Sequence, residues 1–140
     1  MVDQTLIERK FTLLRQKRMV IEGYSIPSLR AFRENQMAQK AVEKMLQEMI
    51  EICMDVGKHI IADENFRIPE DGKAIFTVLG EQSVLTKETA EMMQKMVGFR
   101  NIVVHLYETT DVETVYTIYT KHLSDFDLFS KKILGYLKRA

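Results

Sequence analysis

The sequence predicts an all-α protein, an antiparallel bundle of about four to five helices. Only two prolines and six glycines interrupt the 140 residues, which favours long helices. Apolar residues recur every three or four positions over most of the chain, whereas no segment shows the alternation typical of a strand. No linker or shift in composition divides the chain, so we expect residues 1–140 to form one domain.

Two long helices are expected in the N-terminal half. The first runs from about Asp3 to Tyr24 and ends before Pro27, because the residue that precedes a proline avoids helical angles. The second begins after Ser28, whose side chain suits an N-cap, and continues as a regular apolar stripe to about Ala62.

Three further helices are expected in the C-terminal half, after a loop rich in turn residues. Thr86 suits the N-cap of the middle one, which carries the motif described below. Thr110 and Glu113 match a capping box, in which each side chain satisfies the other's end of the first helical turn. The expected helices cover residues 73–81, 86–106 and 112–137.

The composition excludes several classes of protein. The chain has 20 Lys and Arg against 20 Asp and Glu, with 46% hydrophobic residues, so it is neither disordered nor a binder of nucleic acid through bulk positive charge. Its single cysteine, Cys53, excludes an intrachain disulfide, and its apolar neighbours indicate a buried thiol. The charged N-terminus is unlike a signal peptide, and no apolar run is long enough to span a bilayer, so we expect a cytoplasmic protein.

One short motif contains residue types that are typical of catalytic sites. Arg100, His105 and Tyr107 follow the order Arg-x4-His-x-Tyr at the end of an expected helix. On an ideal helix Arg100 and Tyr107 lie within about 20° of each other, whereas His105 lies about 140° from Arg100 and aligns with Asn101 and Gly98. One helix does not bring Arg and His together, but a glycine on a polar face permits close approach of another backbone. A two-fold dimer would place two copies of both residues in one cleft.

The chain resembles the HEPN superfamily, and within it the HepT-like toxins, over nearly its whole length. The resemblance rests on the Arg-x4-His-x-Tyr pattern together with Gly98-Phe-Arg-Asn, Ala41-Val-Glu-Lys-Met, Asp55-x3-His59, Arg67-Ile-Pro69 and Phe76-x2-Leu79-Gly80. It implies an all-α homodimer with metal-independent ribonuclease activity and no cofactor. By residue match, the resemblance assigns the catalytic roles to Arg100 and His105.

The resemblance also implies a partner, a minimal nucleotidyltransferase antitoxin of the MntA type. Such an antitoxin transfers AMP to the motif tyrosine, here Tyr107, and thereby silences the toxin. The substrate is expected to be tRNA or mRNA, with Asn101 and Gly98 as supporting or substrate-binding positions.

The residue types suit this reaction. Cleavage of RNA without a metal requires removal of the proton from a 2′-OH and stabilisation of the charge that develops on the phosphorane. A histidine titrates near neutral pH and can transfer that proton, whereas an arginine stays charged and binds phosphate oxygens bidentately. An AMP group on Tyr107 would add negative charge and bulk close to Arg100.

Plainer interpretations remain open. The protein is alternatively a binding module that docks a nucleotidyltransferase and presents its substrate, or a helical scaffold dimer. Asp55 and His59 face each other on one helix, either as a cleft pair or as a helix-stabilising contact. The basic runs near both ends of the chain, including Lys131-Lys132 and Lys138-Arg139, either follow phosphates or form solvated helix faces.

The zero net charge limits the nuclease hypothesis but does not exclude it. A neutral chain can still bind RNA where its cations gather locally. The hypothesis therefore predicts a positive cleft around Arg100 and His105, with the acidic residues on other faces.

Overall fold

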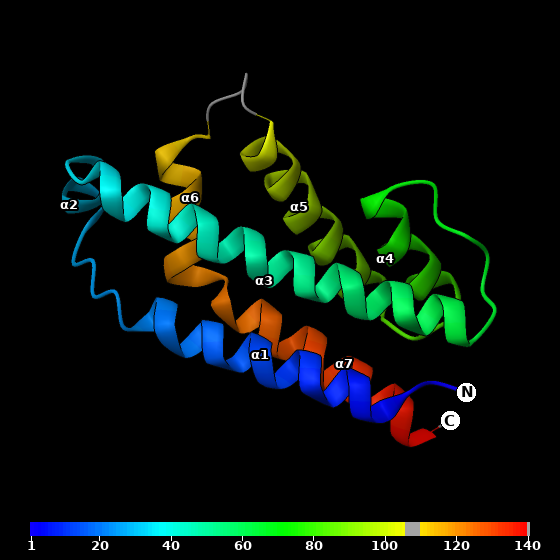
Figure 1. The fold of residues 1–140 in the computed structure, drawn as a ribbon. Coiled ribbons are helices and arrows are strands. Elements are labelled where there is room, and N and C mark those ends of the chain that lie inside the picture. The colour runs from blue at the N-terminus through cyan, green and yellow to red at the C-terminus, as the bar shows by residue number, and fades with distance from the viewer. Residues whose placement is uncertain (106–109, 140) are drawn as a thin grey trace.

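The computed structural model describes residues 1–105 and 110–139, and within them it is a bundle of seven helices without strands (Figure 1). The predicted all-α class is therefore confirmed. The helices are α1 (Gln4–Glu22), α2 (Leu29–Arg33), α3 (Gln36–Asp63), α4 (Gly72–Glu81), α5 (Lys87–Val104), α6 (Val112–Lys121) and α7 (Leu123–Arg139).

The long helix α3 is the centre of the bundle and contacts all six other helices. In Figure 1, α1 and α7 run side by side below α3, while α4 and α5 lie above it. The two ends of the chain lie close together at one end of the bundle. This arrangement follows from the sequence of α3, in which 12 residues are buried and face neighbours on several sides.

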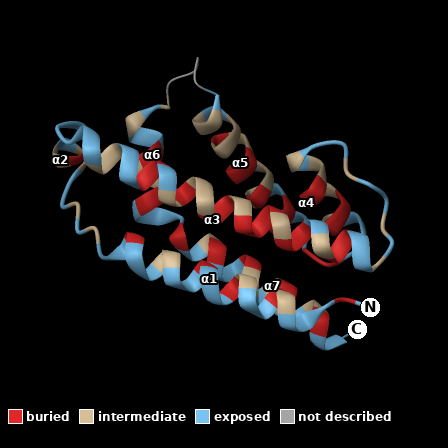
Figure 2. Ribbon diagram, in the orientation of Figure 1, coloured by how far each residue is buried: buried red, intermediate tan, exposed pale blue. Residues whose placement is uncertain are grey.

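The core is continuous between the helices, and the exposed residues lie on their outer faces (Figure 2). Phe129 of α7 is fully buried and joins two layers of the bundle. Its ring meets Phe11 of α1 edge-to-face at a centroid distance of 6.1 Å and Phe76 of α4 at 5.7 Å. Such edge-to-face pairs stabilise a core beyond the area they bury.

The expected helix from Ser28 to Ala62 is divided in two. Ser28 is an N-cap as predicted, but the helix it begins, α2, ends after one turn. Asn35 then caps α3, because its side-chain oxygen accepts a hydrogen bond of 3.0 Å from the backbone N–H of Ala38. A cap inside an apolar stripe leaves the periodicity intact, so the periodicity alone did not reveal the break.

The expected last helix is also divided, at His122, between α6 and α7. The predicted capping box at its start is wrong, because the N-cap of α6 is Asp111, whose side chain accepts from the backbone N–H of Glu113. The hydroxyl of Thr110 instead donates to the carboxylate of Glu43 on α3.

Cys53 is buried, as its apolar neighbours predicted, and burial raises the pKa of its thiol well above the usual range. Among the residues that the structure describes, no helix has the length and apolar character needed to cross a membrane.

Candidate active site

Arg100 lies on α5 and is held by a carboxylate from α3. Its Nε and Nη2 donate to Oε2 of Glu51 at 3.0 and 2.8 Å, and its Nη1 donates to Oδ1 of Asn101 at 3.2 Å. The Arg100 side chain is 26% exposed, so the guanidinium is oriented by protein atoms and still reaches solvent. An arginine held in this way presents a fixed set of donors to a phosphate that arrives from solution.

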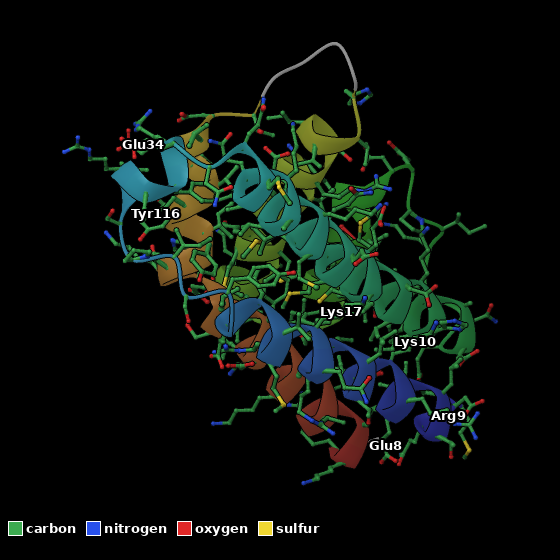
Figure 3. All side chains as sticks on the ribbon, turned by 60° about the vertical axis from the view of Figure 1, so that its left-hand side comes forward. Glu8, Arg9, Lys10, Lys17, Glu34 and Tyr116 are labelled. Carbon is green, nitrogen blue, oxygen red and sulfur yellow. The ribbon has the colours of Figure 1, made fainter. Side chains whose placement is uncertain are left out.

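Arg100 borders a groove of about 450 Å³ between α1, α3 and α5. The groove is weakly positive within one chain, because it is lined by four cations and three carboxylates and each carboxylate is paired with a cation. Lys10 binds Asp55 at 2.7 Å and Lys17 binds Glu48 at 3.3 Å. Figure 3 shows both lysines reaching from α1 towards α3. The lining residues are Lys10, Lys17, Glu48, Glu51, Ile52, Met54, Asp55, Lys58 and Arg100.

Asp55 and His59 form the contact expected from their spacing, but it is a loose one. The distance from His59 Nε2 to Asp55 Oδ2 is 3.8 Å, whereas Lys10 is the closer partner of Asp55. This favours the interpretation of the pair as part of the charge network between α1 and α3.

His105 ends α5. Its backbone N–H donates to the carbonyls of Asn101 and Ile102, at 3.2 and 3.3 Å, and its backbone is extended, with φ −86° and ψ 109°. The side chain is exposed. Because the chain leaves the helix here, the angle of about 140° from Arg100 on an ideal helix no longer fixes where the imidazole points. Tyr107 lies outside the described residues.

Gly98 faces a neighbour within the same chain. A Cβ atom placed on it would lie 3.5 Å from both Cε and Nζ of Lys73 on α4. One helical turn earlier, Gln94 Nε2 donates to Oγ1 of Thr77 at 2.8 Å. The polar stripe of α5 therefore borders α4, and the space beside Gly98 holds the ammonium end of a lysine.

The sequence matches the family described as Ribonuclease HepT-like over residues 15–133, which is most of the chain. The chain belongs to the HepT-like ribonuclease family. The resemblance inferred from the Arg-x4-His-x-Tyr motif is thus confirmed at the level of the family.

Relatives of this HepT-like chain include nucleases named for two kinds of RNA. It is 33% identical to an mRNA nuclease HepT of Shewanella oneidensis over 98 residues, which are 70% of this chain and 74% of the relative. It is 24% identical to a tRNA nuclease HepT of Aphanizomenon flos-aquae over 136 residues, which are 97% of this chain and 92% of the relative.

A solved structure gives the same fold in a complex. The tri-AMPylated HEPN toxin of Shewanella oneidensis, in complex with an MNT antitoxin, matches with a TM-score of 0.87 at 29% identity, over 96% of this chain and 99% of that chain. Its fold is therefore shared over almost the entire HepT-like chain.

Two acidic residues of α3 to which the sequence assigned no role hold both flanks of the motif in this HepT-like chain. Glu51 holds Arg100, and the buried Glu43 accepts from the hydroxyl of Thr110, directly after residues 106–109. A second oxygen of Glu43 lies 3.4 Å from Nζ of Lys40. The sequence signals at Glu43 are its place in Ala41-Val-Glu-Lys-Met, one of the segments that carry the family resemblance, and its position after buried Val42.

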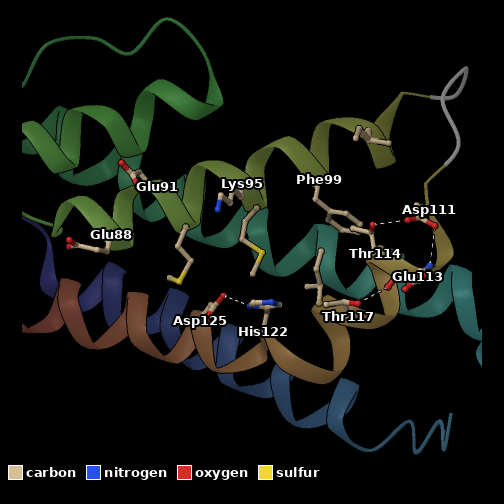
Figure 4. Close-up of a pocket in the computed structure, with 14 residues that line it drawn as sticks. Glu88, Glu91, Lys95, Phe99, Asp111, Glu113, Thr114, Thr117, His122 and Asp125 are labelled. Carbon is tan, nitrogen blue, oxygen red and sulfur yellow. Dashed lines mark hydrogen bonds and ion pairs between the residues drawn. The ribbon is translucent and has the colours of Figure 1, made fainter. Parts of the chain in front are cut away.

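A groove of about 870 Å³ lies between α5, α6 and α7 of the HepT-like chain (Figure 4). Its floor is apolar, and Phe99 and Met96 belong to it. Its rim carries five carboxylates against one ammonium, namely Glu88, Glu91, Asp111, Glu113 and Asp125 against Lys95. This charge repels phosphate, so the groove is unsuited to RNA.

His122, the remaining titratable residue of this acidic groove, has its Nδ1 at 3.0 Å from Oδ2 of Asp125. Figure 4 shows the imidazole turned towards that carboxylate. Among residues 1–105 and 110–139, no three His, Cys, Asp or Glu side chains are arranged to hold a metal ion. We therefore interpret the pair as a contact that stabilises the junction between α6 and α7.

Proposed function

We propose that this HepT-like ribonuclease is the toxin of a toxin–antitoxin pair and cleaves tRNA or mRNA without a metal, using Arg100 and His105. The observation that carries the proposal is the oriented, partly exposed guanidinium of Arg100, five residues before an exposed histidine at the end of the same helix. Relatives named as mRNA and tRNA nucleases support the choice of substrate.

In the proposed reaction, the imidazole of His105 takes the proton of a ribose 2′-OH. The 2′-oxygen attacks the adjacent phosphorus, and the bond to the 5′-oxygen of the next nucleotide breaks. The departing 5′-oxygen takes up a proton from an acid or water, which leaves a cyclic 2′,3′-phosphate and a 5′-OH. Arg100 stabilises the charge on the phosphorane through bidentate hydrogen bonds.

The pairing of Arg100 with Glu51 has a consequence for this reaction. A phosphate that binds the guanidinium must share it with Glu51 or replace that carboxylate. Glu51 therefore orients Arg100 in the free protein and competes with the substrate for it. A homodimer would bring a second Arg100 and His105 to the same cleft. The side chains of one chain would then have to move less to bring an arginine and a histidine to the same phosphate.

Cleavage in the presence of EDTA tests the nuclease function. We expect the purified protein to cleave RNA in EDTA, and Arg100→Ala and His105→Ala to reduce the rate by about 10²-fold or more, as for loss of an acid–base or charge-stabilising group. Circular dichroism checks that both variants fold. Undiminished cleavage by both folded variants would show that other residues carry the reaction.

The proposed antitoxin is a minimal nucleotidyltransferase that attaches AMP to Tyr107. The support is the AMPylated HEPN toxin of Shewanella oneidensis in complex with an MNT antitoxin, which shares the fold of this chain. With ATP and the partner, we expect the mass to increase by whole AMP units in the wild type but not in Tyr107→Phe. An equal increase in Tyr107→Phe would move the modification to another residue.

A binding module without nuclease activity is the second candidate. It is favoured by the double hydrogen bond from Arg100 to Glu51, which is also what a purely structural ion pair would look like. The two functions differ in the EDTA experiment, since a binding module leaves RNA intact while still forming a complex with the nucleotidyltransferase.

A further inference from the structure

Four cationic side chains gather at the end of α5 that is opposite His105. Lys87 begins α5, and Lys131, Lys132 and Arg139 lie on α7 across a hollow of about 590 Å³. We call these four residues and the hollow between them the basic pocket. Its other lining residues, all uncharged, are Gly80, Ser83, Val84, Leu85, Thr86 and Gly135.

The basic pocket brings four cations around one hollow that no acidic residue lines. Across the described residues, none of its four cations has a carboxylate within 4.0 Å. By contrast, Arg18 is paired with Asp127 and Arg67 with Glu81. Like charges that converge without a partner repel one another, and a bound anion relieves that repulsion.

The pocket is also open enough to receive a ligand. A Cβ atom on Gly135 would meet no heavy atom within 4 Å, so the wall formed by α7 is not filled from outside. The floor consists of buried Val84 and Leu85, which add no negative charge.

A surface path along α5 joins the basic pocket to the proposed catalytic residues, and exposed Glu91, four residues after Lys87, borders it. It follows the contact between α4 and α5, past the hydrogen bond between Gln94 and Thr77, to Lys73 beside Gly98. Lys73 is exposed and supplies a cation part-way along. The acidic groove lies along α5 as well, on the face towards α6 and α7, and its carboxylates repel a polyanion from that face.

We propose that the basic pocket binds the phosphodiester backbone of the RNA substrate, at a distance from the bond that is cleaved. The inference rests on the proposed ribonuclease function. The 18 residues of α5 separate the pocket from His105, a distance of about 27 Å at 1.5 Å per residue. At about 3.4 Å per stacked nucleotide, a strand must be roughly eight nucleotides long to reach both.

The test compares two double variants that change the net charge equally. Lys131→Glu with Lys132→Glu alters the basic pocket, and Lys44→Glu with Lys121→Glu alters exposed lysines elsewhere. Both are made in wild type and in His105→Ala, so that RNA binding is measured without cleavage. The probes are fluorescent single-stranded RNAs of about 20 and about five nucleotides, chosen to exceed and to fall short of the span along α5.

We expect the pocket variant to weaken binding of the long RNA about tenfold or more and to lower the slope of log K against log salt by about 1.4, since each lost phosphate contact on a single strand contributes about 0.7. In the wild-type background, we expect the pocket variant to cleave the long RNA with a higher KM and an unchanged kcat. Binding and cleavage of the short RNA stay the same, and so does every property of the control variant. A residue that only stabilises the fold would not produce this dependence on RNA length.

Two results would overturn the inference. One is an equal loss in the pocket and control variants, which would indicate general electrostatic attraction. Another is unchanged binding of the long RNA together with weaker binding of the nucleotidyltransferase, which would assign the pocket to an acidic protein surface. Failure of the nuclease function is separate, because it appears as RNA that the wild type leaves intact, while the binding comparison in His105→Ala still tests the pocket.

Discussion

Gly57 offers a sharp test of the packing that places α3 against α4. It is buried on α3, and a Cβ atom added to it would lie 2.5 Å from Cγ2 of Ile75 and 3.3 Å from Cδ1 of Leu79. Both neighbours are on α4 and almost fully buried. Ile75 is branched at Cβ and has few alternative rotamers, so the helices must move apart to admit even one methyl group.

Two opposing effects set the magnitude of Gly57→Ala. Alanine favours a helix interior over glycine by about 1 kcal/mol. Overpacking a well-filled core costs about 1–3 kcal/mol, and the 2.5 Å contact places this site at the upper end. We therefore expect the free energy of unfolding to fall by about 1–2 kcal/mol. That corresponds to a Tm lower by roughly 3–7 °C for a chain of 140 residues.

Gly135→Ala is the matched control. It also lies inside a helix, α7, but its added methyl group meets nothing within 4 Å. Only the helix preference remains, so the variant should be more stable than wild type by about 0.5–1 kcal/mol. Urea unfolding followed by circular dichroism measures both variants. If Gly57→Ala were stabilised to the same extent as Gly135→Ala, the close contact between α3 and α4 would be wrong.

Three further predictions concern side chains with defined partners. Cys53 should resist Ellman's reagent until the protein unfolds, because burial raises the pKa of its thiol and the thiolate is the reactive form. Glu51→Gln should lower both KM and kcat for RNA cleavage, because Arg100 loses a competing charge and its orientation together. Glu43→Gln and Thr110→Val should each reduce the free energy of unfolding by about 1–2 kcal/mol and be non-additive when combined, as expected of hydrogen-bond partners.

Each of these has an outcome that contradicts it. Rapid labelling of Cys53 in the folded protein would mean that the core opens there. An unchanged KM in Glu51→Gln would show that Glu51 does not compete with the phosphate. Additive losses in the Glu43 and Thr110 double variant would mean that the two side chains act independently.

The helices could be predicted because their signals are local. The apolar stripes and the caps at Ser28 and Thr86 lie within a few residues of the turns they determine, and the structure confirms both caps. The breaks at Asn35 and His122 were missed, since a helix can stop and restart without disturbing the apolar period. At the start of α6, Thr110 and Asp111 are both able to act as the N-cap. Asp111 does so, because the hydroxyl of Thr110 donates a hydrogen bond to Glu43, 67 positions away.

The candidate site could be predicted only in part for the same reason. Arg100 and His105 stand out through their spacing, but the partner of Arg100 is 49 positions away and has no signature of its own. The positive charge expected around Arg100 is largely offset in the groove, because α1 and α3 carry opposite charges on the faces that meet. Which charges neutralise each other depends on how helices pack, and no spacing within one helix contains that information.

The amino-acid sequence by itself determined the all-α class, the family motif and a net charge of zero. These are sums and short-range patterns, and they hold however the helices are arranged. Only the tertiary structure decided where the charge lies: paired in the groove beside Arg100, acidic between α5 and α7, and unpaired and basic at Lys131 and Lys132. The physical reason is that electrostatic interactions depend on distance in space, and packing brings together residues that are far apart along the chain.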